Sequence, residues 1–146
     1  MVVLALATVA GLAVRHRQGR FRAPTAAALD LDSSALPGSA LSAADLGGPL
    51  GAQATLVQFS TEVCAYCGPA RDLLAEVARE RDGIAFVEID AAQRMDLTRR
   101  LHVLATPTVL VLDASGGITS RASGPVRKAD LMEALGKTLA QDGLAS

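Results

Sequence analysis

From residue 54 onward, the chain alternates between segments patterned as β-strands and segments patterned as amphipathic helices. β-Branched and aromatic residues dominate the strand-like segments, whereas apolar residues recur every three or four positions in the helical ones. This pattern predicts strands over residues 54–60, 84–90, 107–113 and 118–124, and helices over 68–83, 94–103 and 126–143.

This order of elements limits how the strands can pair. The first two strands are separated by a long helical crossover, and such a connection joins parallel strands of one sheet. The last two are separated by a short segment rich in glycine, which predicts an antiparallel hairpin. We therefore expect an α/β fold with a central four-stranded mixed sheet flanked by helices.

The N-terminal segment has a different character. Residues 1–14 are apolar and uncharged, and arginines follow at positions 15, 17, 20 and 22. A helix of this length spans about 21 Å, which is short for a hydrocarbon core of about 30 Å. A cleaved signal peptide carries its positive charge before the apolar run, which is the reverse of the order here.

We therefore predict that residues 1–22 form an N-terminal hydrophobic helix that anchors the protein in a membrane as a single-pass segment. Basic residues stay on the cytoplasmic side, so the rest of the chain is expected to face the cytoplasm. A cleaved secretory signal and a buried or disordered terminal helix are the alternatives.

Residues 23–49 are predicted to be a flexible linker, because prolines are scattered there among Gly, Ser and Ala. Within it, Ser42 is suited to cap a short helix that runs through Leu46 and stops at Gly47. This division leaves residues 50–142 as the folded domain.

The two cysteines, Cys64 and Cys67, lie within the segment STEVCAYCGP. Their spacing is compatible with a metal site, a structural disulfide or a redox pair. A disulfide across two residues closes a very small loop, so it would stabilise the fold little. A structural zinc site usually needs four ligands, and the only histidines are His16 and His102.

The position of the pair favours redox chemistry, because it lies between a predicted strand and the start of the following helix. Backbone N–H groups and the helix dipole stabilise a thiolate at a helix N-terminus, so a lowered pKa is expected for Cys64. Cys67, one turn further, can attack a mixed disulfide formed at Cys64 and release the product. Pro69 suits the first helical turn, where a missing N–H does no harm.

With these features the chain resembles the thioredoxin family over about residues 50–142. The shared motifs are the Cys-x-x-Cys after a strand, the segment ATPT with Pro107 forty residues beyond Cys67, and Gly124 after the last strand. The resemblance implies a thioredoxin-like fold. It also implies a cis peptide bond between Thr106 and Pro107 that faces the cysteine pair, so that the backbone of Thr106 can pair with an extended substrate.

The resemblance further implies a thiol–disulfide oxidoreductase, and a protein disulfide reductase in particular, with Cys64 and Cys67 as catalytic residues. Substrates would be protein or small-molecule disulfides and thiols, and an unknown partner would donate or accept electrons. No cofactor and no metal are expected. The residues expected to bind substrate are Ala65, Tyr66, Thr106 and Pro107.

The chain departs from the family pattern at several positions. Thioredoxins carry a buried Asp where this chain has Gln58, and often a Lys where it has Phe86. They carry Trp at the position of Val63, and Gly-Pro in place of Ala65-Tyr66. Because a neutral amide cannot take up the proton of Cys67, we expect Gln58 to limit the resolving step.

Other polar residues near the motif receive a plainer interpretation. Glu62, Glu88 and Arg71 are interpreted as solvated side chains, and His102 as a surface or helix-end residue that is a doubtful metal ligand.

The main alternative function is a non-catalytic thioredoxin-like module that binds a partner protein or a soft metal such as copper through the two cysteines. A net charge of −1 gives no reason to expect nucleic acid as a partner.

Overall fold

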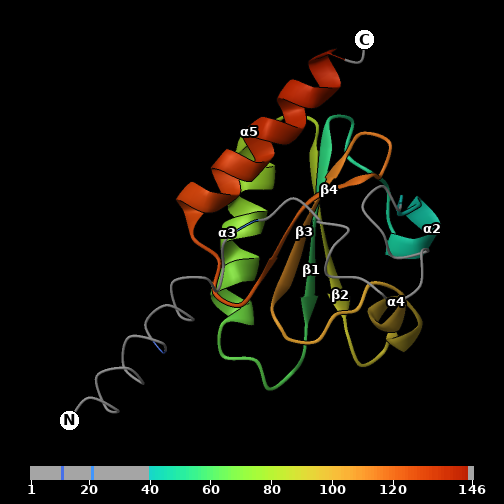
Figure 1. The fold of residues 1–146 in the computed structure, drawn as a ribbon, viewed down its shortest axis with the longest axis vertical. Helices are drawn as coiled ribbons and strands as arrows, with labels where there is room; N and C mark the ends of the chain where they lie inside the picture. Colours follow the sequence, from blue (N-terminus) through green and yellow to red (C-terminus); the bar gives the residue numbers. More distant parts are fainter. Residues whose placement is uncertain (1–10, 12–20, 22–39, 145–146) are drawn as a thin grey trace.

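The computed structural model of the chain describes Gly11, Phe21 and residues 40–144. Four strands form one sheet in the order β2-β1-β3-β4 (Figure 1). Their bounds are Ala54–Ser60 for β1, Ile84–Asp90 for β2, Thr108–Asp113 for β3 and Ile118–Ser123 for β4. β1 pairs with β2 in parallel and with β3 antiparallel, and β3 and β4 form an antiparallel hairpin. The predicted mixed sheet is confirmed.

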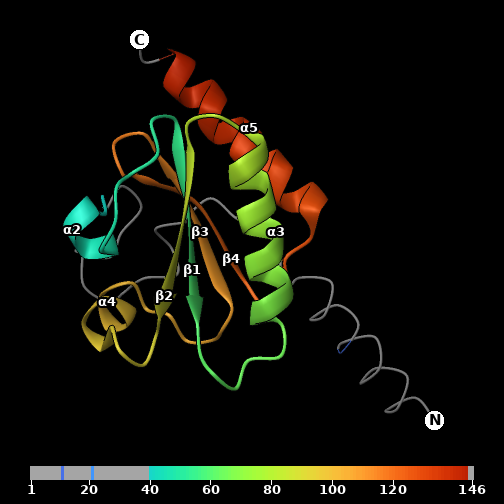
Figure 2. The ribbon, with the colours of Figure 1, turned by 180° about the vertical axis from the view of Figure 1, so that it is seen from behind.

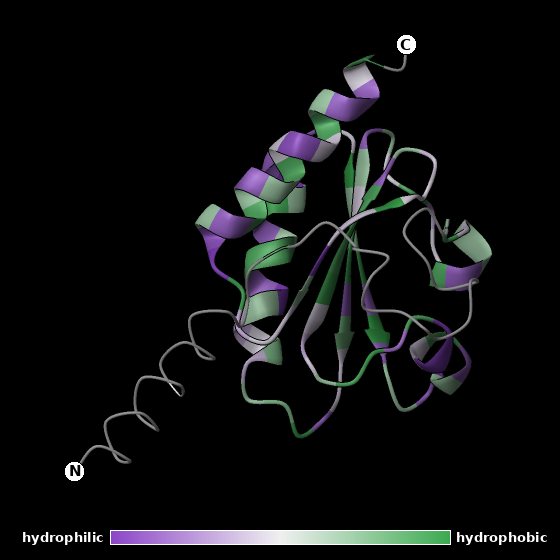
Figure 3. Cartoon of the chain, viewed as in Figure 1, coloured by the Kyte–Doolittle hydropathy of each residue, from purple (hydrophilic) through white to green (hydrophobic). Residues whose placement is uncertain are grey.

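Helices cover both faces of the sheet, as the two opposite views show (Figures 1 and 2). On one face lie α3 (Cys67–Glu80) and α5 (Lys128–Leu144), and on the other lie α2 (Ala43–Leu46) and α4 (Met95–Arg100). β1 is buried along its whole length, because it has a strand on each side and helices over both faces. The hydrophobic colour is concentrated in the strands, whereas both colours alternate along α5 (Figure 3).

The last ten residues of the predicted linker belong to the packed structure. Leu41 is 1% exposed and Leu46 is 5% exposed, and both join the core cluster under α4. The Leu41 N–H donates to the carbonyl of Gly116 at 2.9 Å. A Cβ atom at Gly116 would collide with the Leu41 backbone, so this contact requires glycine. Residues 40–49 thus differ from the flexible linker that was expected, because Leu41 and Leu46 pack into the core, while most of the other residues of the segment are exposed.

The short helix in this segment has the predicted caps. The Ser42 hydroxyl accepts a hydrogen bond from the Asp45 N–H, and the Asp45 carboxylate accepts one from the Ser42 N–H. Gly47 ends the helix in the left-handed conformation. Arg100 on α4 forms an ion pair with Asp45 at 2.9 Å, which ties α2 to α4.

The predicted anchor, residues 1–22, and residues 23–39 of the predicted linker lie outside the described residues, except for Gly11 and Phe21. Phe21 is half-buried and packs against the cluster beneath α3 and α5. In the part of the chain that the structure describes, no helix combines the length and the apolar character needed to cross a membrane.

Candidate functional site

Cys64 and Cys67 are joined by a disulfide at the N-terminus of α3. Their Cα atoms are 5.4 Å apart, and the Cys67 N–H donates to the Cys64 carbonyl at 3.3 Å. Cys67 is the first residue of α3 and is 3% exposed, whereas Cys64 lies in the preceding loop and is half-buried. Cys64 is therefore more accessible to a partner molecule than Cys67.

The loop around the disulfide presents apolar side chains to solvent. Val63 is 96% exposed and Tyr66 is 57% exposed, and Ala65 between the cysteines is exposed as well. Contiguous exposed apolar side chains, rather than single ones, are typical of surfaces that contact other molecules. Substrate binding by Ala65 and Tyr66 remains a prediction.

The segment that carries Pro107 lies beside this loop. The Thr106–Pro107 peptide bond is cis, as the resemblance implies. The hydroxyl oxygens of Thr61 and Thr106 are 3.1 Å apart and hydrogen-bonded, which joins the loop after β1 to the segment before β3. Pro107 is buried, and its carbonyl accepts a hydrogen bond from the Gly124 N–H at 2.8 Å. Substrate binding by Thr106 and Pro107 is likewise still a prediction.

Gln58 contacts the backbone of the second cysteine. It is fully buried in the middle of β1, and its Nε2 donates to the carbonyl of Cys67 at 2.9 Å. Its Oε1 is also buried and has no hydrogen-bond partner among the described residues. The structure therefore places a neutral amide, which cannot act as a base near neutral pH, against the residue expected to resolve mixed disulfides.

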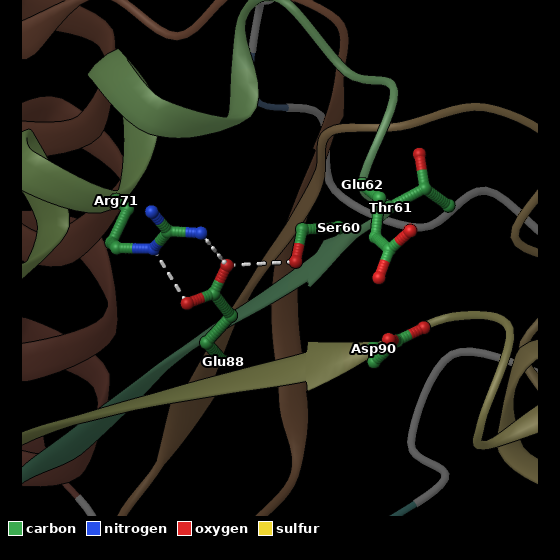
Figure 4. A pocket seen from close by; sticks show the side chains of 6 residues that line it. All are labelled: Ser60, Thr61, Glu62, Arg71, Glu88 and Asp90. Atoms are coloured by element: carbon green, nitrogen blue, oxygen red, sulfur yellow. Dashed lines mark hydrogen bonds and ion pairs between the residues drawn. The ribbon is translucent and has the colours of Figure 1, made fainter.

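A polar pocket of about 320 Å³ opens at the ends of β1 and β2 (Figure 4). Arg71 on α3 and Glu88 on β2 face each other in it, and both guanidinium–carboxylate hydrogen bonds are 2.6 Å long. The Ser60 hydroxyl donates to the same carboxylate at 2.7 Å. The pocket is lined by Ser60, Thr61, Glu62, Arg71, Glu88 and Asp90.

This pocket contains a pairing that the sequence analysis did not predict. Glu88 and Arg71 were interpreted as solvated side chains; both residues are exposed, and they also form one hydrogen-bonded unit between the sheet and α3. The hydrogen bonds from Arg71 lower the pKa of the Glu88 carboxyl, partial burial opposes this, and Ser60 adds to the lowering. The two partners are seventeen residues apart in the sequence, so no local pattern could have predicted the pair.

His102 follows α4, as expected of a helix-end residue, but it is not a plain surface side chain. Its backbone is left-handed, with a φ of 48°, and its carbonyl accepts a hydrogen bond from the Arg121 guanidinium at 2.7 Å. Its Nε2 is buried without a partner among the described residues. Nor do the described residues contain any group of three or more His, Cys, Asp or Glu side chains that is arranged to hold a metal ion.

Comparisons with known proteins agree with this geometry. The domain model of thioredoxin matches residues 50–137 of the chain. Chloroplastic thioredoxin z, whose structure is described as defining a novel type-specific target recognition, is 27% identical with a TM-score of 0.55. That match covers 61% of this chain and 80% of the other.

Two further solved structures share the fold. A malarial protein is 19% identical with a TM-score of 0.54, over 60% of this chain and 98% of its own. A reduced thioredoxin pre-protein of Schistosoma mansoni is 20% identical with a TM-score of 0.52, over 59% of this chain and 79% of its own. At such low identity these two matches show similarity of fold alone. No curated protein matches the chain.

Proposed function

The chain belongs to the thioredoxin family, and from this membership we propose that it is a thiol–disulfide oxidoreductase that reduces protein disulfides through Cys64 and Cys67. The observation that carries the proposal is the disulfide between these residues at the start of α3. The Cα atoms of the two cysteines are 5.4 Å apart, which is within the range that a disulfide bridges without movement of the backbone.

The proposed reaction runs in two exchange steps. The thiolate of Cys64 attacks one sulfur of a substrate disulfide, forms a mixed disulfide and releases the other substrate sulfur as a thiolate. The sulfur of Cys67, after losing its proton, attacks the Cys64 sulfur and releases the second substrate thiolate. The substrate gains two electrons, the protein is left with the Cys64–Cys67 disulfide, and a separate dithiol donor reduces it again.

The assignment of roles rests on exposure. The residue that meets substrate first has to be reachable, and Cys64 is more exposed than Cys67. The N-terminus of α3 adds unpaired backbone N–H groups and a positive dipole end, which favour a thiolate at Cys64. The exposed side chains of Ala65 and Tyr66 and the backbone of Thr106 are proposed to hold the substrate segment beside it.

The cellular location is a separate part of the proposal. The apolar run of residues 1–14 and the arginines after it support a membrane anchor with the domain on the cytoplasmic side. A reducing compartment would keep the two cysteines as thiols, as a disulfide reductase requires.

A redox titration combined with a turnover assay tests the proposed activity. We expect a defined two-electron midpoint, together with catalytic reduction of a test protein disulfide by dithiothreitol. Cys64→Ser should abolish turnover, whereas Glu133→Gln on the exposed face of α5 should leave it unchanged. Stoichiometric retention of copper without turnover would instead support a metal-binding module.

A further inference from the structure

Gln58 is a buried polar residue with apolar neighbours on one side and a charged neighbour on the other. Its neighbour on β2 is Glu88. Its neighbour on β3 is Val109, and the residue two positions before it on β1 is Leu56. Both belong to the core cluster beneath α3 and α5, together with Leu74 of α3. A fully buried carboxamide in such surroundings destabilises the fold unless its donors and its acceptor are hydrogen-bonded.

The orientation of this carboxamide is set by its contact with Cys67. A carbonyl oxygen only accepts hydrogen bonds, so the group 2.9 Å from the Cys67 carbonyl has to be Nε2 rather than Oε1. Oε1 is then left as a buried acceptor with no partner among the described residues, in the state in which Cys64 and Cys67 form a disulfide. Each such unpaired buried acceptor is energetically unfavourable.

Reduction of the disulfide supplies a donor on the residue that Gln58 contacts. The sulfur of Cys67 carries no proton in the disulfide, but it becomes a buried S–H group when the bond is reduced. The oxygen of a carboxamide lies about 2.2 Å from its nitrogen, so Oε1 is within about 5 Å of the Cys67 carbonyl oxygen. The new donor and the unpaired acceptor therefore belong to residues already in contact.

We propose that in the reduced protein the Cys67 thiol donates a hydrogen bond to Oε1 of Gln58, and that Gln58 thereby raises the reduction potential of the cysteine pair. The half-reaction takes two electrons from a dithiol or from glutathione, and two protons. One proton is bound by the Cys67 sulfur, where it points to Oε1, and the other is bound by the Cys64 sulfur at a pH below the pKa of that thiol.

The direction of the effect follows from the two states. The disulfide form contains the unpaired acceptor, and the dithiol form satisfies it, so Gln58 stabilises the dithiol form relative to the disulfide form. Stabilisation of the reduced form makes a redox protein a stronger oxidant and a weaker reductant. The hydrogen bond from Nε2 to the Cys67 carbonyl is present in both forms, so it cancels from the comparison.

The inference rests on the proposed function only in that the cysteine pair cycles between disulfide and dithiol. The experiment is equilibration of the purified full chain with glutathione buffers, followed by quantification of the two forms. Gln58→Leu removes the amide at similar volume, and Gln58→Met does so with an unbranched side chain that adapts to the site. Both variants should shift the equilibrium about tenfold toward the disulfide, which for two electrons is about 30 mV.

Thr55→Val is the matched control. Thr55 is fully buried on the same strand, near the opposite end from the cysteines, and its hydroxyl accepts a hydrogen bond from the Gly51 N–H at 2.9 Å. This variant loses a buried polar group and should lose stability, but its glutathione equilibrium should match that of the wild type. If the role of Gln58 were purely structural, all three variants would have the same glutathione equilibrium.

The outcomes are separable from those of the activity assay. An unchanged equilibrium in a folded Gln58 variant, or an equal shift in Thr55→Val, overturns the inference, whatever the turnover is. A shift confined to the Gln58 variants supports it, even if no protein disulfide is reduced catalytically. In that case the difference between the unfolding free energies of the oxidised and reduced protein should change by the free energy that corresponds to the measured fold-change in the equilibrium.

Discussion

Glu88 on β2 and Arg71 on α3 form a two-point ion pair, with two hydrogen bonds of 2.6 Å between the guanidinium and the carboxylate. The pair connects β2 to the N-terminal part of the helix that begins at Cys67. It lies in the pocket whose lining includes Thr61 and Glu62, close in sequence to Cys64. This contact between α3 and β2 therefore depends on the ionisation of the Glu88 carboxyl group.

The first prediction concerns acid stability. The pKa of Glu88 is lowered by Arg71, so the folded protein binds fewer protons here than the unfolded chain. The stabilisation is therefore complete above the ordinary pKa of about 4.3 and is lost as the pH falls through the folded-state pKa. Glu88→Gln should lower the free energy of unfolding slightly at pH 7 and flatten its decline below about pH 4.3, as measured by urea unfolding at several pH values.

Glu133→Gln provides the control for this measurement, since Glu133 pairs with Lys137 on the exposed face of α5. If it flattened the acid decline as much as Glu88→Gln, the effect could not be assigned to the Arg71–Glu88 pair.

The second prediction assigns the two cysteines. Cys67→Ser removes the resolving thiol but leaves the more exposed Cys64, so a mixed disulfide with a substrate should accumulate. Non-reducing electrophoresis after mixing with a test disulfide measures the adduct. Cys64→Ser should form far less of it, because Cys67 is buried; equal trapping by both variants would show that the roles are assigned wrongly.

The third prediction concerns the resolving step. An aspartate in place of Gln58 would put a proton acceptor beside Cys67, so Gln58→Asp should release the mixed disulfide roughly tenfold faster or more near pH 7. A buried carboxylate should also lower stability. Stopped-flow measurement of release checks the rate.

Gln58→Asn separates the charge from the shortening of the side chain, since it has the length of Asp and remains neutral. Faster release in Gln58→Asp but not in Gln58→Asn is expected. An unchanged or slower rate in Gln58→Asp would rule out proton transfer at this position.

The fourth prediction tests whether residues 40–49 stabilise the domain. Leu41 is 1% exposed within the core, so Leu41→Ala should lower the free energy of unfolding by roughly 2–5 kcal/mol. Leu144→Ala, at a position that is 90% exposed, should change it little. The measurement is chemical denaturation of both variants. Equally small effects of the two substitutions would show that residues 40–49 do not stabilise the domain.

The fifth prediction concerns topology. The arginines after the apolar run predict that the domain faces the cytoplasm, so a reporter that is active only there should be active when fused after Ser146. A silent fusion, together with labelling of the cysteines by an impermeant thiol reagent on intact cells, would place the domain on the outer side.

Local patterns in the sequence determined the elements and their order. The β-branched and aromatic residues of β1 and β2 and the helical spacing of Leu74 and Val77 in α3 are local features of the sequence, so they could be recognised without the fold. The same is true of the capping box at Ser42 and of the cysteine pair before a helix. The Thr106–Pro107 cis bond is not a local property, and it was anticipated only through the resemblance to a family.

Tertiary structure decided which distant side chains meet. Three such contacts join residues that are far apart in sequence or on different elements. They are the pairing of Arg71 with Glu88, the contact of Gln58 with the Cys67 carbonyl, and the packing of Leu41 in the core. Whether a polar side chain is solvated or paired depends on the neighbours that the sheet register and the helix packing bring to it. These neighbours are set by burial of the whole apolar surface, which no single segment of the chain encodes.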